Sequence, residues 1–340
     1  MERIDSSHQQ SGTILILALW SLGLLTIFAL TLGGMVRQKI ALFSRLEERN
    51  KLHLLAEAGI KKAIVILNQD LTSNKMNRCN KEKDFGAIQL DNGVCEVSYE
   101  YNDGKIFHPQ KCYGIVDEES KININKADVS VLKNLIKSIL GWQDSDAKNL
   151  AASIIDWREY GESEMTGFYS EDYYANLEYP YSPKNSYFEI IDELLLVKGM
   201  TEDILQKLSP YITVYGDGKI NLNTAPRLVL TAMGLQEGLV DKILSVRRGP
   251  DGIEATEDDV IFQDYHDPLK RLQKFINLTE EEIAQMNEFV SEGKFVAYSH
   301  FYFLQSLAKL NKGKSSSIIK CVFNTDEHKI EYWKEEYVSF

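Results

Sequence analysis

The chain has 340 residues, of which 44% are hydrophobic and 26% are charged, and only seven are proline. This composition excludes a wholly disordered chain, and the length predicts more than one hydrophobic core. The formal net charge of −12 at pH 7 disfavours non-specific binding to nucleic acid and favours cations, because contacts to phosphates need an excess of Lys and Arg.

The chain opens with a short polar leader, residues 1–12, and an uncharged apolar segment, residues 13–36. As a helix rising about 1.5 Å per residue, this segment can cross a hydrocarbon core of about 30 Å. It is too long for the apolar part of a cleavable secretory signal, so we predict a transmembrane helix. Taken alone, the basic residues beyond it favour a cytoplasmic body by the positive-inside rule; they are Arg37, Lys39 and Arg45.

The helical pattern continues through residues 37–70, so we expect one unbroken helix from about Thr13 to about Leu67. Small or apolar residues recur there at the spacing of a single helix face, at Leu52, Leu55, Gly59 and Ala63. This stripe predicts a face that packs against another structural element.

Strand patterns occupy the two segments 71–116 and 294–340, which are predicted to form one α/β body. Expected strands cover residues 94–101, 113–116, 295–303, 317–323 and 329–338. Asn-Asp-Gly at residues 102–104 indicates a hairpin turn after the first of them.

The middle of the chain is predicted to be helical. Expected amphipathic helices cover residues 128–140, 147–157, 188–197, 202–208 and 227–233. An internal repeat, K-I-N-[IL]-N-x-A, occurs within residues 117–127 and again within residues 216–226, each time before a helix. We therefore predict two related helical subdomains, residues 117–215 and residues 216–293, whose asparagines cap the helices that follow.

Sequence motifs for catalysis are weak. The chain lacks H-E-x-x-H, G-x-S-x-G and a phosphate-binding loop, and its six histidines do not have metal-ligand spacing. Residues 306–309 match S-x-x-K, a pattern short enough to occur by chance. The sequence gives no support for an enzyme.

Two acidic loops are candidate calcium sites, because Ca²⁺ takes six to eight oxygen ligands. The candidate ligands of the first loop, residues 249–259, are Asp251, Glu254, Thr256, Asp258 and Asp259. Those of the second are Glu159, Glu162, Glu171 and Asp172. The alternative is that both loops are solvated acidic turns.

Residues 197–201 resemble a helix-hairpin-helix turn, which in other proteins binds a DNA phosphate through backbone N–H groups. Its acidic neighbours Glu193, Glu202 and Asp203 oppose phosphate, so a packing role is favoured.

Four cysteines, Cys79, Cys95, Cys112 and Cys321, include no C-x-x-C pair. Outside the cytoplasm they could form two disulfides with three connectivities, and buried thiols are the alternative.

Several stretches carry motifs that occur together in one family. Ser11-Gly12, near the N-terminus, precede an aliphatic run that ends in Leu19-Trp20. Ala56–Gly59 follows beyond the membrane segment. The helical region contains Ile154–Arg158 and Glu171–Tyr174, and then, in order, Asp192–Leu194, Val197–Met200 and Ile220–Pro226. In this order the motifs resemble general secretion pathway protein K, the large minor pseudopilin family of bacterial type II secretion systems, over nearly the whole chain.

The resemblance implies an α+β chain. Its long N-terminal transmembrane helix would lead into a pilin-like α/β body with a large insertion of two SAM-like, helix-hairpin-helix-type subdomains. It implies cleavage after Gly12 by a prepilin peptidase and methylation of Thr13. Most pilins have a glutamate where this chain has Leu17, and its absence is typical of the K member. A subunit at the filament tip has no neighbour above it to pair with such a carboxylate, which would be costly to bury alone.

The resemblance also implies a single-pass protein of the bacterial inner membrane whose body lies in the periplasm. Its expected partners are other minor pseudopilins and the pseudopilus, contacted at Leu17 and along the stripe from Leu52 to Ile66, and calcium is expected in the insertion. No nucleic acid is expected. The alternatives are a membrane-anchored, competence-type DNA-binding protein and a membrane-anchored hydrolase.

Overall fold

The computed structural model describes residues 7–72, 81–90, 92–101, 110–159, 171–253, 256, 258–263, 268–311, 313 and 315–339. The chain divides into two units, Met1–Leu54 and Leu55–Phe340, which are described separately below.

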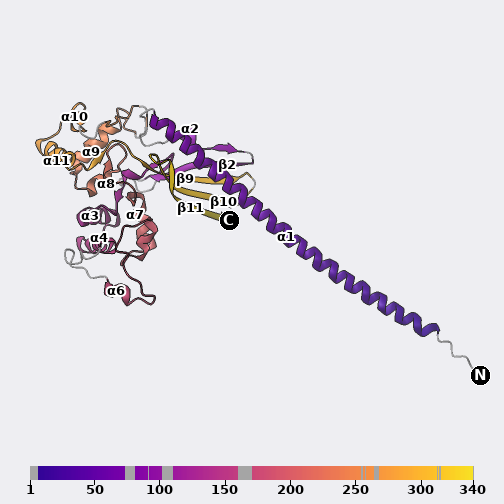
Figure 1. Ribbon diagram of the computed structural model, residues 1–340. Coiled ribbons are helices and arrows are strands. Elements are labelled where there is room, and N and C mark those ends of the chain that lie inside the picture. Colours follow the sequence, from indigo (N-terminus) through magenta and orange to yellow (C-terminus); the bar gives the residue numbers. More distant parts are fainter. Residues whose placement is uncertain are drawn as a thin grey trace, which may run out of the picture. The chain divides into compact units, whose positions relative to one another are not determined.

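One unbroken helix, α1 (Ser7–Thr72), contains the whole apolar segment and continues into the second unit (Figure 1). The predicted continuous helix is therefore confirmed, and it extends beyond both expected ends. Its apolar stretch is long enough to cross a membrane, and none of it is buried within the protein.

A seven-stranded antiparallel sheet forms the body of the second unit, in the order β1-β2-β9-β10-β11, with β3 paired to β2 and β4 paired to β9. Its strands are β1 (Ile88–Leu90), β2 (Gly93–Tyr101), β3 (Gln110–Tyr113), β4 (Val116–Asp117), β9 (Phe301–Leu310), β10 (Ser315–Asn324) and β11 (Lys329–Ser339). A short helix, α2 (Glu82–Phe85), precedes β1. Because β2 pairs with β9, the two segments of the chain form one body, as predicted.

Two expected strands are each divided in the structure. Residues 113–116 were expected to form one strand, but Gly114, with φ of 143°, separates β3 from β4, and the two pair with different neighbours. Residues 295–303 are divided between β8 (Phe295–Val296) and β9, which belong to different sheets. A run of apolar residues predicts extended backbone but does not say with which strand it pairs.

The insertion between β4 and β9 consists of two helical repeats, entered through a 3-10 helix, η1 (Glu118–Ser120). The first comprises β5 (Ile122–Asn123), α3 (Val129–Leu140), α4 (Asp144–Arg158), α6 (Glu171–Ala175), η2 (Ile191–Leu196), α7 (Glu202–Leu208), η3 (Ser209–Tyr211) and β6 (Ile212–Thr213). The second comprises β7 (Ile220–Asn221), α8 (Arg227–Ala232), α9 (Glu237–Arg247), α10 (Pro268–Gln273), α11 (Glu280–Ser291) and β8.

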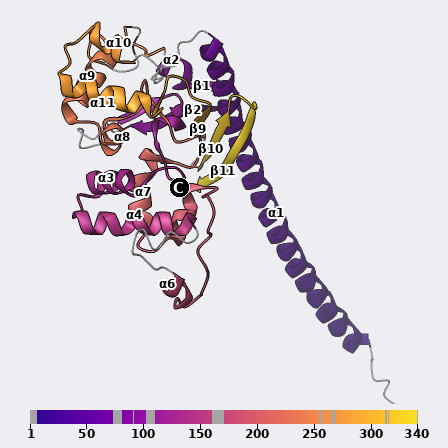
Figure 2. The same cartoon turned by 60° about the vertical axis from the view of Figure 1, so that its left-hand side comes forward.

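Each repeat is closed by a parallel strand pair, β5 with β6 and β7 with β8. The second repeat therefore runs to Val296, beyond the expected boundary at residue 293. In Figure 2, α3 and α4 lie side by side in the first repeat and α9 to α11 gather in the second. One hydrophobic core extends through both repeats, so they form a single folded insertion.

The helices of the structure differ from the expected ones in two ways. Residues 188–197 form only the 3-10 helix η2 (Ile191–Leu196), and Phe188, before it, is bonded through its backbone N–H and C=O to Asn125. In addition, five helices of the structure were not expected: α2, α6, α9, α10 and α11. A capping box was the available signal for α11: Thr279 Oγ1 accepts from Glu282 N, and Glu282 Oε2 accepts from Thr279 N.

Candidate functional site

The N-terminal part of α1 presents an apolar surface to its surroundings. Leu17 is 65% exposed and Trp20 is 75% exposed. The hydroxyls of Ser21, Thr26 and Thr31 each donate to a carbonyl three or four residues earlier, at 2.8–2.9 Å. Hydroxyls satisfied within the helix are suited to a bilayer, where no water is available to hydrogen-bond them.

The expected processing site lies on the same helix. Gly12 belongs to α1, and a Cβ placed there would have no heavy atom within 4 Å. Thr13 is likewise exposed. The structure therefore leaves space around these two residues, and cleavage stays a prediction.

The stripe on α1 packs against this chain's own sheet. Leu55 and Ala63 are 7% and 0% exposed, and a Cβ at Gly59 would lie 2.3 Å from Ser306 Oγ of β9. Leu52 is also fully buried. The expectation that Leu52, Leu55, Gly59 and Ala63 contact partner helices is therefore wrong. Helical periodicity reveals a buried face but cannot say which part of which molecule covers it.

The repeated K-I-N-x-N-x-A motif builds the same hydrogen-bond clamp twice. Asn125 Oδ1 accepts from Phe188 N at 2.8 Å, and its Nδ2 donates to Phe188 O at 3.0 Å. Asn223 Oδ1 accepts from Phe262 N at 2.7 Å, and its Nδ2 donates to Phe262 O at 2.9 Å. In each repeat, the second asparagine of the motif therefore bonds to the backbone of a distant segment and holds it next to the end of strand β5 or β7.

An arginine completes each clamp. Arg158 at the end of α4 donates to the carbonyls of Ile124 and Ala127. Arg247 at the end of α9 donates to the carbonyls of Leu222 and Ala225, the corresponding positions of the second repeat. Both arginines are buried. The sequence reading missed them, although each is the last residue of the second helix after its motif.

The asparagines do not cap helices, contrary to the sequence-based expectation. Asp128 caps α3 by accepting from Val131 N at 2.9 Å, and Pro226 occupies the position before α8. The first asparagine of each motif, Asn123 or Asn221, accepts from the backbone N–H two residues later. Such asparagine turns satisfy the same preference for local backbone bonding in a different way.

The two acidic loops occupy equivalent places in the repeats, between the clamping arginine and the clamped phenylalanine. In the second repeat, Asp258 Oδ2 accepts from Asp251 N at 3.1 Å, and Thr256 Oγ1 donates to Asp258 Oδ1 at 2.6 Å and to Asp259 Oδ1 at 3.3 Å. The Thr256 hydroxyl bond lowers the pKa of Asp258. Glu254 lies outside the described residues.

In the first repeat the loop is described only in part. Glu159 Oε1 accepts from Arg158 Nε at 2.6 Å, and Glu171 and Asp172 begin α6, whereas Glu162 lies outside the described residues. Within the part of the chain that the structure describes, no three His, Cys, Asp or Glu residues come close enough to hold a metal ion. Calcium stays a prediction at both loops.

The cysteines in the sheet are buried. Burial raises the pKa of Cys95, and it raises the pKa of Cys321 to about 12. Both are free thiols, so the connectivities that bond either of them are excluded in this structure. Cys112 is also buried, and Cys79 lies outside the described residues.

The turn that resembles a helix-hairpin-helix motif uses its backbone within the protein. Gly199 adopts φ of 83°, and Lys198 N–H donates to Tyr174 Oη at 3.0 Å. The side chain of Tyr174 is fully buried and packs edge-on against Trp157. These contacts favour the packing role over phosphate binding.

Residues Asp117 to Lys121, here called the buried joint, connect the sheet to both repeats and are each at most 7% exposed. Asp117 Oδ2 accepts from Asn221 Nδ2 at 2.9 Å, from Ser299 Oγ at 2.7 Å and from Thr224 Oγ1 at 2.5 Å. One carboxylate therefore ties the second repeat and the returning chain to β4. The local sequence pattern does not predict that these polar residues are buried.

The neighbouring carboxylates bind the other segments of the joint. Glu118 accepts from Lys121 Nζ at 2.5 Å and from Thr213 Oγ1 at 2.5 Å, and Glu119 Oε2 accepts from His300 N at 3.0 Å. Burial and, to a lesser extent, the nearby Asp117 carboxylate raise the pKa of Glu119 to about 7. Burial also raises the pKa of Asp117.

This environment predicts a pH-dependent stability. Because the pKa of Glu119 rises from 4.5 to about 7 on folding, the folded protein holds a proton that the unfolded chain releases. Its free energy of unfolding should therefore decrease as pH rises from about 4.5 to about 7, by on the order of 3 kcal/mol from this residue. Thermal melts of the detergent-solubilised chain would measure this, and Glu119→Gln should flatten the slope. An unchanged slope in the variant would contradict the assignment.

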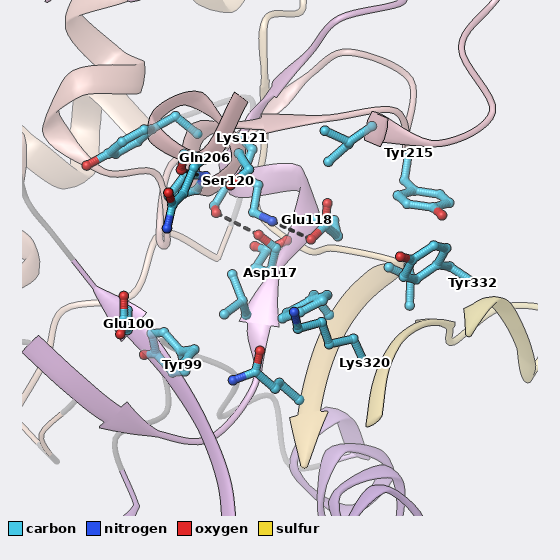
Figure 3. Close-up of a pocket in the computed structure, with 18 of the residues that line it drawn as sticks. Tyr99, Glu100, Asp117, Glu118, Ser120, Lys121, Gln206, Tyr215, Lys320 and Tyr332 are labelled. Carbon is cyan, nitrogen blue, oxygen red and sulfur yellow. Dashed lines mark hydrogen bonds and ion pairs between the residues drawn. The ribbon is translucent and has the colours of Figure 1, made fainter. Parts of the chain in front are cut away.

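A cavity of about 650 Å³ lies between the sheet and the first repeat. Figure 3 shows Tyr99 and Glu100 of β2 on one side of it, Tyr215 and Tyr332 on the opposite side, and Asp117 of the buried joint between them. Lys334 of β11 pairs with Asp192 of η2 at 3.2 Å and bridges the two walls.

A family model described as type II secretion system (T2SS), protein K, matches residues 113–217. Three relatives named type II secretion system protein K are similar to the chain. That of Pectobacterium carotovorum subsp. carotovorum is 28% identical over 145 residues, which is 39% of this chain and 44% of that protein. That of Aeromonas hydrophila is 24% identical over 65% of this chain and 69% of its own length, and that of Pseudomonas aeruginosa is 26% identical over 73% and 75%.

Among solved structures, the chain is similar to one from the GspK-GspI-GspJ complex of the type 2 secretion system of enterotoxigenic Escherichia coli. The TM-score is 0.60 at 16% identity, covering 86% of this chain and 99% of that chain, which shows a shared fold. The family model covers the first helical repeat, and the three relatives carry one and the same name. The family model and the three relatives therefore agree that the chain is similar to type II secretion system protein K.

Proposed function

We propose that the chain is a structural, non-catalytic minor pseudopilin of a type II secretion system, anchored in the bacterial inner membrane with its body in the periplasm. The observation that carries this is the single helix α1, whose exposed apolar part continues without a break into a helix packed on a β-sheet. One helix thus provides both a membrane anchor and a segment that packs on the sheet. This arrangement is suited to a subunit that is held in a bilayer before it is assembled into a filament.

The proposed position is the tip of the pseudopilus, and two features support it. Leu17 leaves no carboxylate in the exposed apolar part of α1, so no subunit above is needed to neutralise one. The insertion, from the buried joint to Val296, adds a second core to the body. Such bulk would hinder stacking of another subunit beyond it.

The proposed partners are the other minor pseudopilins. The structural neighbour belongs to a complex with two further proteins, GspI and GspJ, and the corresponding subunits of this system are the proposed neighbours here. Because the Leu55 to Ala63 stripe is already covered, the contact surface on α1 must use its exposed residues, such as Val65, which is 55% exposed.

Immunogold labelling of isolated pseudopili, with a tag fused after Phe340, tests the tip position. We expect one gold cluster at one end of each filament. Gold along the filament would overturn the tip position. Absence of gold from pseudopili, with the protein present in the membrane, would overturn the pseudopilin assignment itself.

Processing by the prepilin peptidase belongs to the same proposal. Mass spectrometry of the native protein should show a mature N-terminus at Thr13, with the added mass of one methyl group. Retention of residues 1–12 in the assembled protein would contradict it.

We also propose that the acidic loops bind calcium, because in the second repeat Asp258 accepts from the backbone N–H of Asp251, and Thr256 donates to both Asp258 and Asp259. Calcium added to metal-free protein should raise Tm, and Asp258→Asn should reduce the shift, because carboxylate oxygens are preferred Ca²⁺ ligands. Asp203→Asn, at an exposed position on α7, is the matched control. A Tm unmoved by calcium in the wild type would show that the loops are solvated acidic turns.

A further inference from the structure

We propose that the cavity between the sheet and the first repeat binds an extended peptide segment of a partner protein, in which an arginine or lysine side chain lies between apolar neighbours. This goes beyond the position of the chain in the pseudopilus and does not depend on it. The argument uses the apolar walls, the aromatic rings and the balance of charge in the cavity.

The walls of the cavity leave apolar surface uncovered. On the helical side, Ile190 and Leu195 are 38% and 41% exposed, and on the sheet side Phe303 and Tyr332 are half-buried. The volume of about 650 Å³ lies within the range of about 300–1,000 Å³ typical of ligand pockets. A ligand with apolar groups on both sides would remove both surfaces from water.

Aromatic rings are concentrated in the lining. The aromatic residues that line the cavity are Tyr99, Tyr101, Tyr211, Tyr215, Phe303 and Tyr332. The face of an aromatic ring attracts a cation, and more strongly when water is partly excluded. The lining is therefore suited to a cationic group with apolar neighbours.

The charges in the cavity favour the same ligand. Its three lysines are already paired with carboxylates: Lys121 with Glu118 at 2.5 Å, Lys320 with Glu336 at 2.9 Å, and Lys334 with Asp192 at 3.2 Å. Glu100 and Glu202 also line the cavity and are exposed, and among the described residues no lysine or arginine forms an ion pair with either. The cavity thus has an excess of negative charge, which opposes an anionic ligand and attracts a cation.

A peptide meets these conditions better than a small free amine. The aromatic walls stand on both sides of the opening, so a ligand must be elongated to contact both (Figure 3). Gln206 also lines the cavity, and its side-chain amide can hydrogen-bond to peptide groups, as polar groups in peptide-binding grooves do. A small amine would satisfy the carboxylates and leave the apolar walls exposed.

Fluorescence polarisation with the full-length protein in detergent tests the proposal. The probe is a labelled hexapeptide with one central arginine between leucine and valine residues. A matched peptide carries the neutral isostere citrulline, and another carries glutamate. We expect binding in the order arginine, citrulline, glutamate, with the arginine peptide about tenfold tighter than the citrulline peptide. Added salt should reduce this difference.

Two variants locate the binding. The double variant Glu100→Gln, Glu202→Gln should bind the arginine peptide about tenfold more weakly and the citrulline peptide unchanged. Glu237→Gln, Glu288→Gln changes two exposed carboxylates that do not line the cavity, with the same change in net charge, and should bind as the wild type does. Leu195→Lys places in the cavity a positive charge that repels the arginine of the peptide, and it should abolish binding. Because Leu195 is already 41% exposed, the Tm of this variant should stay close to that of the wild type.

The proposal is overturned if the arginine peptide does not bind, if the citrulline peptide binds equally well, or if either cavity variant binds as the wild type does. These outcomes do not bear on the tip position, because gold labelling reads the location of the chain and not its ligand.

Discussion

Replacing Gly59 with valine should strongly destabilise the body, even in the absence of any partner. A Cβ at this position would lie 2.3 Å from Ser306 Oγ and 3.2 Å from Cys95 Sγ. Ser306 lies in the central strand β9 and is fully buried, so it cannot move aside without shifting the sheet. Overpacking of this kind costs about 1–3 kcal/mol, and a branched side chain is at the upper end or beyond.

Thermal melts of the solubilised chain would measure the effect, at roughly 2–4 °C for each kcal/mol in a body of this size. Gly33→Val is the control, since a Cβ there has no heavy atom within 4 Å. Ser306→Gly combined with Gly59→Ala should recover part of the loss, because it removes the atom that clashes. An unchanged Tm for Gly59→Val, with lost association only, would restore the view that this face contacts partners.

Replacing Asn223 with alanine is the second change with a large expected effect. Its side chain makes three bonds with distant backbone: it accepts from Phe262 N and donates to the carbonyls of Phe262 and Ala297. Phe262 and Ala297 are both buried, and each buried polar group left unsatisfied costs about 1–3 kcal/mol. We expect a total loss of about 3 kcal/mol or more.

Asn125→Ala should produce a comparable loss, because it removes the equivalent clamp on Phe188. Since one core extends through both repeats, each variant should lower a single common Tm and should not produce two separate transitions. Asn149→Ala, at an exposed position on α4, provides the control. Two resolved transitions in calorimetry would show that the repeats fold independently.

The local patterns of the sequence determined the elements that depend on near neighbours. The long helix, strand β2 and helix α7 follow from hydropathy, alternation and capping within a few turns of chain, and all three form where expected. The repeated motif correctly indicated a duplicated insertion, because the asparagine of each copy forms the same hydrogen bond, with the backbone of Phe188 in one repeat and of Phe262 in the other. The resemblance to the general secretion pathway protein K family rested on the order of such motifs along the chain.

Only the tertiary structure decided which surface each element meets. The stripe around Gly59 faces this chain's own sheet, the motif asparagines clamp segments 39 and 63 residues away, and three adjacent acids lie buried in the joint. These outcomes depend on contacts between residues far apart in the chain. The periodicity of a local segment does not show which distant residues it will contact. Periodicity therefore established that a helix face or a polar residue is buried, and the packing of the sheet against the insertion determined what buries it.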